Sequence, residues 1–132
     1  MAIIIVTKKS LGGEYNLATD PGAGAAGAIG TGVFLPPNSV ITRFWIKTLT
    51  TFVAGVGTTV GFTMGTGGKD LFAPTIAGAL IGGAVASGVD FNANPEPLNV
   101  LAVPQVIFVI AGAFPLTAGR VTFVIDYTEM DF

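Results

Sequence analysis

The stretch Val40-Ile-Thr-Arg-Phe-Trp-Ile-Lys-Thr-Leu49 alternates between two kinds of side chain, and this alternation decides the fold class. Residues two apart share one face of a β-strand, so the stretch predicts a strand with two unlike faces. One predicted face holds Ile41, Arg43, Trp45 and Lys47. The other is apolar apart from threonine and is predicted to face the core: Val40, Thr42, Phe44, Ile46 and Thr48. A turn signal, Pro36-Pro37-Asn38-Ser39, precedes the strand.

The end of the sequence repeats the pattern. In the segment 119–128, one predicted face is formed by Val121, Phe123, Ile125 and Tyr127. Other short runs are candidate strands: Ala2–Thr7, Gly30–Leu35, Thr58–Met64, Asn99–Val103 and Gln105–Ala111. Short strands separated by turn residues predict an all-β fold, an antiparallel β-sandwich that is jelly-roll-like. The apolar segment Thr75–Ala86 fits either a short helix or a strand.

A length of 132 residues predicts a single β-sandwich domain over residues 1–132, with residues 1–32 considered as an extended N-terminal arm and loop. Within that part, Gly22-Ala-Gly-Ala-Ala-Gly27 matches the dinucleotide-binding pattern in letters only. No clear strand precedes it, and Gly30, Gly32 and Pro36 disfavour a following helix.

The sequence carries unusually little charge. Charged residues make up 11% of it and apolar residues 51%, whereas soluble domains have about 25% charged residues. A folded monomer of this size exposes roughly 6,500 Å², and so few charged side chains cannot cover that surface. We therefore expect contiguous exposed apolar patches, which mark contacts with other chains or with lipid.

Composition also disfavours whole classes of function. The sequence has no cysteine and no histidine, which removes the usual ligands of zinc, copper and haem and every histidine-based triad. We expect no cofactor, no metal and no enzymatic activity. The net charge of −2 argues against nucleic-acid binding. The carboxylates Asp126, Glu129 and Asp131 crowd the end of the chain, where solvation is favoured over a cation site.

One segment supports a rival interpretation. Leu71–Val89 contains no charged residue and includes the G-x-x-x-G pattern Gly78-Ala-Leu-Ile-Gly82, which allows close helix packing in membranes. Pro74, the high glycine content and the lack of flanking tryptophan, tyrosine or basic clusters disfavour a membrane span.

The proline turn, the strand Val40–Leu49 and the ending Leu116-Thr-Ala-Gly-Arg-Val-Thr-Phe-Val-Ile-Asp-Tyr127 together resemble small structural proteins of tailed bacteriophages. These include capsid decoration, or cement, proteins and head fibres. The resemblance covers roughly residues 33 to 128. It implies a β-sandwich, usually trimeric, on the outer surface of the capsid, and it carries no catalytic motif.

These observations favour a virion structural protein that forms a homo-oligomer, with a trimer favoured, and binds the major capsid protein or another virion protein on the capsid exterior. The interface candidates are Ile3, Ile4, Ile5, Trp45 and Phe132. Three alternatives stay open: a phage tail, baseplate or fibre subunit; a small membrane protein spanning with Leu71–Val89; and a carbohydrate-binding β-sandwich in which Trp45 stacks on sugars.

Overall fold

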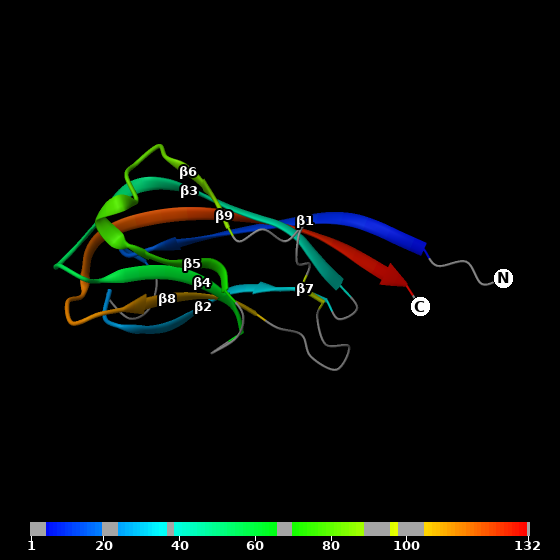
Figure 1. Ribbon diagram of the computed structural model, residues 1–132, viewed down its shortest axis with the longest axis horizontal. Coiled ribbons are helices and arrows are strands. Elements are labelled where there is room, and N and C mark those ends of the chain that lie inside the picture. The colour runs from blue at the N-terminus through cyan, green and yellow to red at the C-terminus, as the bar shows by residue number, and fades with distance from the viewer. Residues whose placement is uncertain are drawn as a thin grey trace.

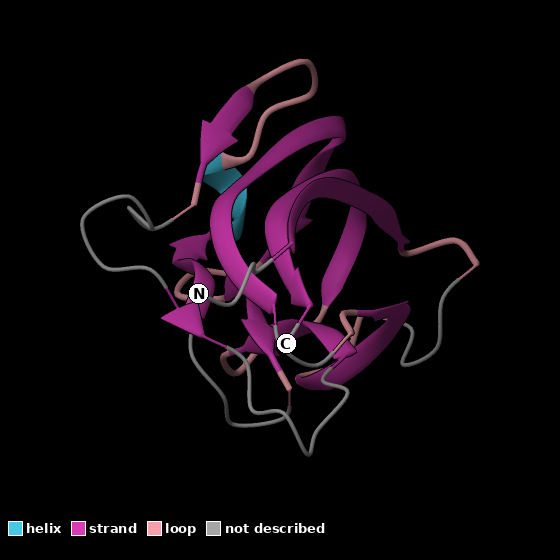
Figure 2. Ribbon diagram, turned by 90° about the vertical axis from the view of Figure 1, so that its right-hand side faces the viewer, coloured by secondary structure: helices cyan, strands magenta, loops and turns pink. Residues whose placement is uncertain are grey.

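The computed structural model describes residues 5–19, 24–36, 39–65, 70–88, 96–97 and 105–131. Most of these residues lie in strands (Figure 1), and the one helical element among them is a single 3-10 turn, η1 (Ala77–Ala79) (Figure 2). In chain order the strands are β1 (Ile5–Asn16), β2 (Gly27–Phe34), β3 (Ser39–Ala54), β4 (Thr59–Met64), β5 (Asp70–Ile76), β6 (Val85–Ser87), β7 (Glu96–Pro97), β8 (Gln105–Ala111) and β9 (Leu116–Asp131).

The strands form two antiparallel sheets. The first sheet has the order β1-β9-β3-β6, with β7 also paired to β3, and the second has the order β2-β8-β4-β5. Apart from the two-residue β7, the pairs are nested: β1 pairs with β9, β2 with β8, β3 with β6 and β4 with β5. The prediction of an all-β, antiparallel sandwich is confirmed.

The strand directions divide the molecule into two ends. Figure 1 shows the start of β1, at Ile5, and the end of β9, at Asp131, at one end of the sandwich, which we call the terminus end. The connections β3–β4, β5–β6 and β8–β9 lie at the opposite end. We call this second region, residues 53–58, 76–84 and 112–115, the loop end. The two ends share one core but differ in surface chemistry.

The core lies between the sheets and is dominated by aromatic rings. Phe108 of β8 is fully buried; its ring stacks on Tyr15 of β1 with centroids 3.9 Å apart and meets Phe62 of β4 edge-on at 5.1 Å. Three of the five residues of β3 predicted to face the core are buried: Phe44, Ile46 and Thr48. The four residues predicted to share one face of β9 are also buried: Val121, Phe123, Ile125 and Tyr127. The two alternating stretches therefore form the inner face of the first sheet.

The prediction for Ile41 is wrong. Ile41 is fully buried, although the alternation places it on the outer face with Arg43. The register of β3 against β9 shifts at this point, because Ile41 pairs with Tyr127 and Arg43 pairs with Asp126. One extra residue in β3 is a β-bulge, and a bulge changes the face of every residue before it. Val40 and Thr42, which were predicted to face the core, are half-buried instead. Arg43, Trp45 and Lys47 keep their predicted outward side.

Residues 5–16 and 27–34 are strands of the two sheets and not an arm and loop. β1 pairs with β9 from Ile5↔Asp131 to Asn16↔Arg120, and β2 pairs with β8. The alternation in β1 is weak in the sequence because it lies at a sheet edge, where polar residues and the glycines Gly12 and Gly13 are tolerated. The predicted strand at Asn99–Val103 lies outside the described residues.

The segment 71–88 is divided between β5, η1 and β6. The alternative of a spanning helix at Leu71–Val89 is therefore wrong, and Thr75–Ala86 contains the end of one strand, the 3-10 turn and the start of another. Pro74 and the paired glycines Gly82 and Gly83 are residues that interrupt a helix. In the part of the chain that the structure describes, no helix has the length and apolar character needed to cross a bilayer.

Candidate functional site

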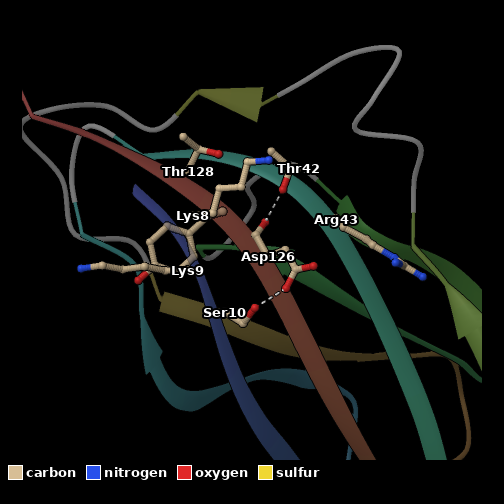
Figure 3. Close-up of a pocket in the computed structure, with 8 residues that line it drawn as sticks. Lys8, Lys9, Ser10, Thr42, Arg43, Asp126 and Thr128 are labelled. Carbon is tan, nitrogen blue, oxygen red and sulfur yellow. Dashed lines mark hydrogen bonds between the residues drawn. The ribbon is translucent and has the colours of Figure 1, made fainter. Parts of the chain in front are cut away.

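A polar groove lies on the outer face of the first sheet, near the terminus end (Figure 3). Its volume is about 590 Å³. Three neighbouring strands contribute its lining, β1, β9 and β3, with β9 in the middle. The lining residues are Lys8, Lys9, Ser10, Thr42, Arg43, Asp126, Tyr127 and Thr128.

The strand register brings the polar groups of the groove together. Ser10 of β1 and Arg43 of β3 both pair with Asp126 of β9, one from each side. Lys8 pairs with Thr128, two residues further along β9. Because residues two apart share a face, these side chains occupy the same side of the sheet. Figure 3 shows Lys8 reaching across the strands toward Thr42, while Lys9 points to the other side.

Hydrogen bonds and an ion pair hold four of the eight lining residues in place: Lys9, Ser10, Thr42 and Asp126. The Ser10 hydroxyl donates to Oδ1 of Asp126 at 2.5 Å, and the Thr42 hydroxyl donates to the backbone oxygen of Asp126 at 3.2 Å. Lys9 Nζ lies 2.7 Å from Oε2 of Glu129. The pKa of Lys9 is raised above its usual 10.5 because its ammonium group donates a hydrogen bond to Glu129 and is attracted by that negative charge.

The groove offers charge and hydrogen bonds but no acid–base pair. Asp126 is the one carboxylate among its lining residues, and the Ser10 hydroxyl is bonded to it. A nucleophilic serine needs a base that accepts its proton and a third group that orients the base. Within the described ranges, no cluster of three or more histidine, cysteine, aspartate or glutamate residues could hold a metal ion. This arrangement suits non-covalent contact.

Trp45, an interface candidate, lies half-buried on the same outer face, next to the groove. The Arg43 guanidinium lies over the indole ring, 4.6 Å from its centroid, in a cation–π contact. A sugar that stacked on this side of the ring would have to displace Arg43. The contact therefore weakens the carbohydrate-binding alternative.

The other interface candidates lie at the chain termini. Ile3, Ile4 and Phe132 are outside the described residues. For Ile5 the structure describes the backbone, which pairs with Asp131. Asp131 has a described backbone only, so of the suggested carboxylate cluster the structure places two side chains, Asp126 beside Ser10 and Glu129 beside Lys9.

The sequence reasoning missed the loop end as a surface. Among the exposed large apolar residues of the described chain, five belong to it: Val53, Val56, Ile76, Ile81 and Phe114. Two more, Leu49 and Val85, continue the surface along β3 and β6. The available signal was the absence of any charged residue from 53–58, 76–84 and 112–115. Low charge predicted such a patch but not its position.

Fold and surfaces together define a β-sandwich with a polar groove at one end and an apolar surface at the other. The comparison with solved structures finds this fold in a chain of the capsid of Ralstonia phage GP4. The match has a TM-score of 0.56 at 16% sequence identity, and it covers 93% of this chain and 84% of that chain. No family model matches the sequence, and no curated protein matches it. The expected resemblance to phage structural proteins is thus confirmed at the level of the fold.

Proposed function

We propose that this chain is a non-enzymatic structural protein of a bacteriophage virion, namely a capsid decoration or cement subunit. It would form a homo-oligomer, with a trimer favoured, and bind the major capsid protein on the exterior of the head. The observation that carries this proposal is the fold shared with a capsid chain over 93% of the sequence. The low charge and the exposed apolar loop end support it, because both favour protein contacts.

The mechanism follows from mass action. A subunit that binds the assembled lattice but not its separated parts stabilises the lattice, by an amount that grows with its concentration relative to its dissociation constant. Burial of apolar side chains would drive that binding at about 25 cal/mol per Å², before the costs of association. A surface with few charges suits the role because few ions lose their hydration at the contacts.

We also propose that the sandwich is a jelly roll, an architecture used by viral capsid proteins. The nested pairing supports this assignment, because the strands pair as in a long hairpin folded over on itself. The pairs are β1 with β9, β2 with β8, β3 with β6 and β4 with β5.

Electron microscopy of virions that carry a labelled copy of the chain tests the proposal. We expect the label on the outer surface of the head, and we expect particles that lack the chain to lose their contents at a lower temperature than decorated particles. A label confined to the tail would point to a tail, baseplate or fibre subunit. Either that result or unlabelled particles would overturn the assignment.

A further inference from the structure

The loop end exposes several large apolar side chains, whereas solvated loops are usually polar. Val56, at the tip of the β3–β4 connection, is 94% exposed. Around it, Ile76 is 62%, Ile81 59%, Phe114 51% and Val53 50% exposed. Single exposed apolar residues are common on protein surfaces, but a contiguous group of large ones marks a contact site.

Hydrogen bonds between the connections hold this surface in one arrangement. The Thr58 hydroxyl of the β3–β4 connection donates to the backbone oxygen of Phe114 at 2.8 Å. The backbone N–H of Ala77 donates to the oxygen of Thr58 at 2.9 Å, and the N–H of Gly82 donates to the hydroxyl of Thr51 at 2.9 Å. All three connections are therefore tied to β3 or to each other. A preordered surface loses little conformational entropy on binding.

The absence of charge from this end restricts what can cover it. None of its residues, 53–58, 76–84 and 112–115, is charged. Glu14 and Arg120, on strands β1 and β9 of the first sheet, are paired with each other at 3.0 Å. Asp20, in the β1–β2 connection, lies outside the described residues. An acidic or basic partner surface would leave its own charges desolvated and unpaired against the loop end.

We propose that the occupant of the loop end is another copy of this chain, which contributes its own loop end to the contact. A copy of the loop end brings no charge to the contact, so apolar side chains meet without like-charge repulsion. A stable interface buries about 800 Å² per partner. Leu49 and Val85, 40% and 66% exposed, continue the apolar surface along β3 and β6, up to the exposed Lys47 that pairs with Val85. The inference rests on the proposed function, because it identifies the surface through which a virion subunit of this kind would self-associate.

Val56→Lys tests this inference. The side chain of Val56 is almost fully solvated, so lysine fits without a change of fold, yet in a contact between like surfaces it places ammonium groups near each other. Sedimentation velocity over a concentration series should show self-association of the unmodified chain. We expect Val56→Lys to weaken that association by at least about tenfold, because like charges that face each other at a contact repel.

Phe34→Lys is the matched control. Phe34 is 52% exposed and ends β2 on the side of Gln105, away from the loop end. It receives the same charge, and we expect unchanged association. Thermal unfolding of both variants verifies their folds. The inference is overturned if the unmodified chain stays monomeric up to the highest concentration measured. It is also overturned if Val56→Lys associates as tightly as the unmodified chain.

Binding of the same proteins to undecorated phage capsids separates this inference from the proposed function. If Val56→Lys self-associates normally but no longer binds capsids, the loop end docks on the capsid protein, and the self-association proposal is wrong. If the chain associates through the loop end but never binds capsids, the inference stands and the cement function fails.

Discussion

The terminus end and the loop end of the sandwich are built from the same strands but present opposite surfaces. At the terminus end, five charged residues line or flank a polar groove: Lys8, Lys9, Arg43, Asp126 and Glu129. Lys9 pairs with Glu129, Asp126 accepts from the Ser10 hydroxyl, and Arg43 lies over the Trp45 ring. At the loop end, the connections contain no charge and expose large apolar side chains. The first surface pairs part of its charge internally, whereas the second exposes apolar side chains, for which we propose a protein partner.

This difference shows how a chain with little charge can form a stable core and still present an apolar surface suited to protein contacts. The alternating strands β3 and β9 fix which side chains enter the core, and the register then gathers the outward polar groups over three neighbouring strands. Few charges are left for the connections. We therefore expect the distribution of charge between the ends, rather than the total charge, to determine where the molecule associates.

The largest effect on stability is expected from a change in the shared core, on which both ends of the sandwich depend. Phe108→Ala deletes a fully buried ring that contacts Tyr15, Phe52 and Phe62, and it should lower the free energy of unfolding by about 3–5 kcal/mol. Urea denaturation measures this loss. Val109→Ala, a half-buried neighbour outside the core cluster on the same strand, should cost much less. Equal losses would contradict the view that the ring cluster holds the sheets together.

A smaller change should disturb the loop end alone. A Cβ atom on Gly55 would overlap the Cβ and Cγ atoms of Phe114, close to the backbone where the ring cannot swing away cheaply. Gly55→Ala should therefore displace the β8–β9 connection and cost about 1–3 kcal/mol of stability, together with part of the self-association.

Gly78→Ala is the control at the same end, because a Cβ there meets no atom within 4 Å. It should leave both the denaturation midpoint and the association unchanged. If Gly55→Ala behaves like Gly78→Ala, the packing of Phe114 on the β3–β4 connection does not hold the loop end in shape.

The sequence alone predicts the parts of this fold in which one strand face is much more apolar than the other. Phe44, Ile46 and the four inward residues of β9 follow from period-two alternation, because both strands lie inside the first sheet with one face on the core. Ile41 could not be predicted, since the bulge that turns it inward is a property of the register with β9. The candidate strand Ala2–Thr7 covers only the start of β1, and the rest was missed because an edge strand needs only one partner and little alternation.

The candidate surfaces were predictable in kind but not in place. Low charge indicated exposed apolar area, yet nothing in the sequence shows that Val56, Ile81 and Phe114 share one end. Their proximity comes from the nested order of the strands and from hydrogen bonds between distant connections, such as that from Thr58 to Phe114. The polar groove likewise depends on register, because Ser10 and Asp126 are far apart in the chain.

Salt should separate the two ends without any substitution. At about 1 M NaCl the screening length is about 3 Å, so exposed ion pairs weaken, while apolar contacts keep their strength or gain. We expect self-association to be unchanged or stronger in sedimentation experiments. Dilution calorimetry should give a negative heat-capacity change for association. Steep weakening with salt would instead assign the contact to the charged groups of the terminus end.

The smallest effect is expected from the ion pair between Lys9 and Glu129 at the terminus end. Both side chains are partly exposed, at 48% and 32%, so solvent screens their attraction. The bonded carboxylate raises the pKa of Lys9 in the folded state above the unfolded value of 10.5. A raised pKa means that the pair contributes fully below pH 10.5 and loses its contribution as the pH rises through the folded value.

Lys9→Met and Glu129→Gln should each lower the thermal midpoint slightly at neutral pH, and the double variant should lower it by less than the sum of both, since either change already breaks the pair. The difference between Lys9→Met and the unmodified chain should shrink in strongly alkaline buffer and in high salt, whereas self-association should be the same in every variant. If removal of the pair altered association as strongly as Val56→Lys, the terminus end would belong to the contact, and the division of the surface between the two ends would be wrong.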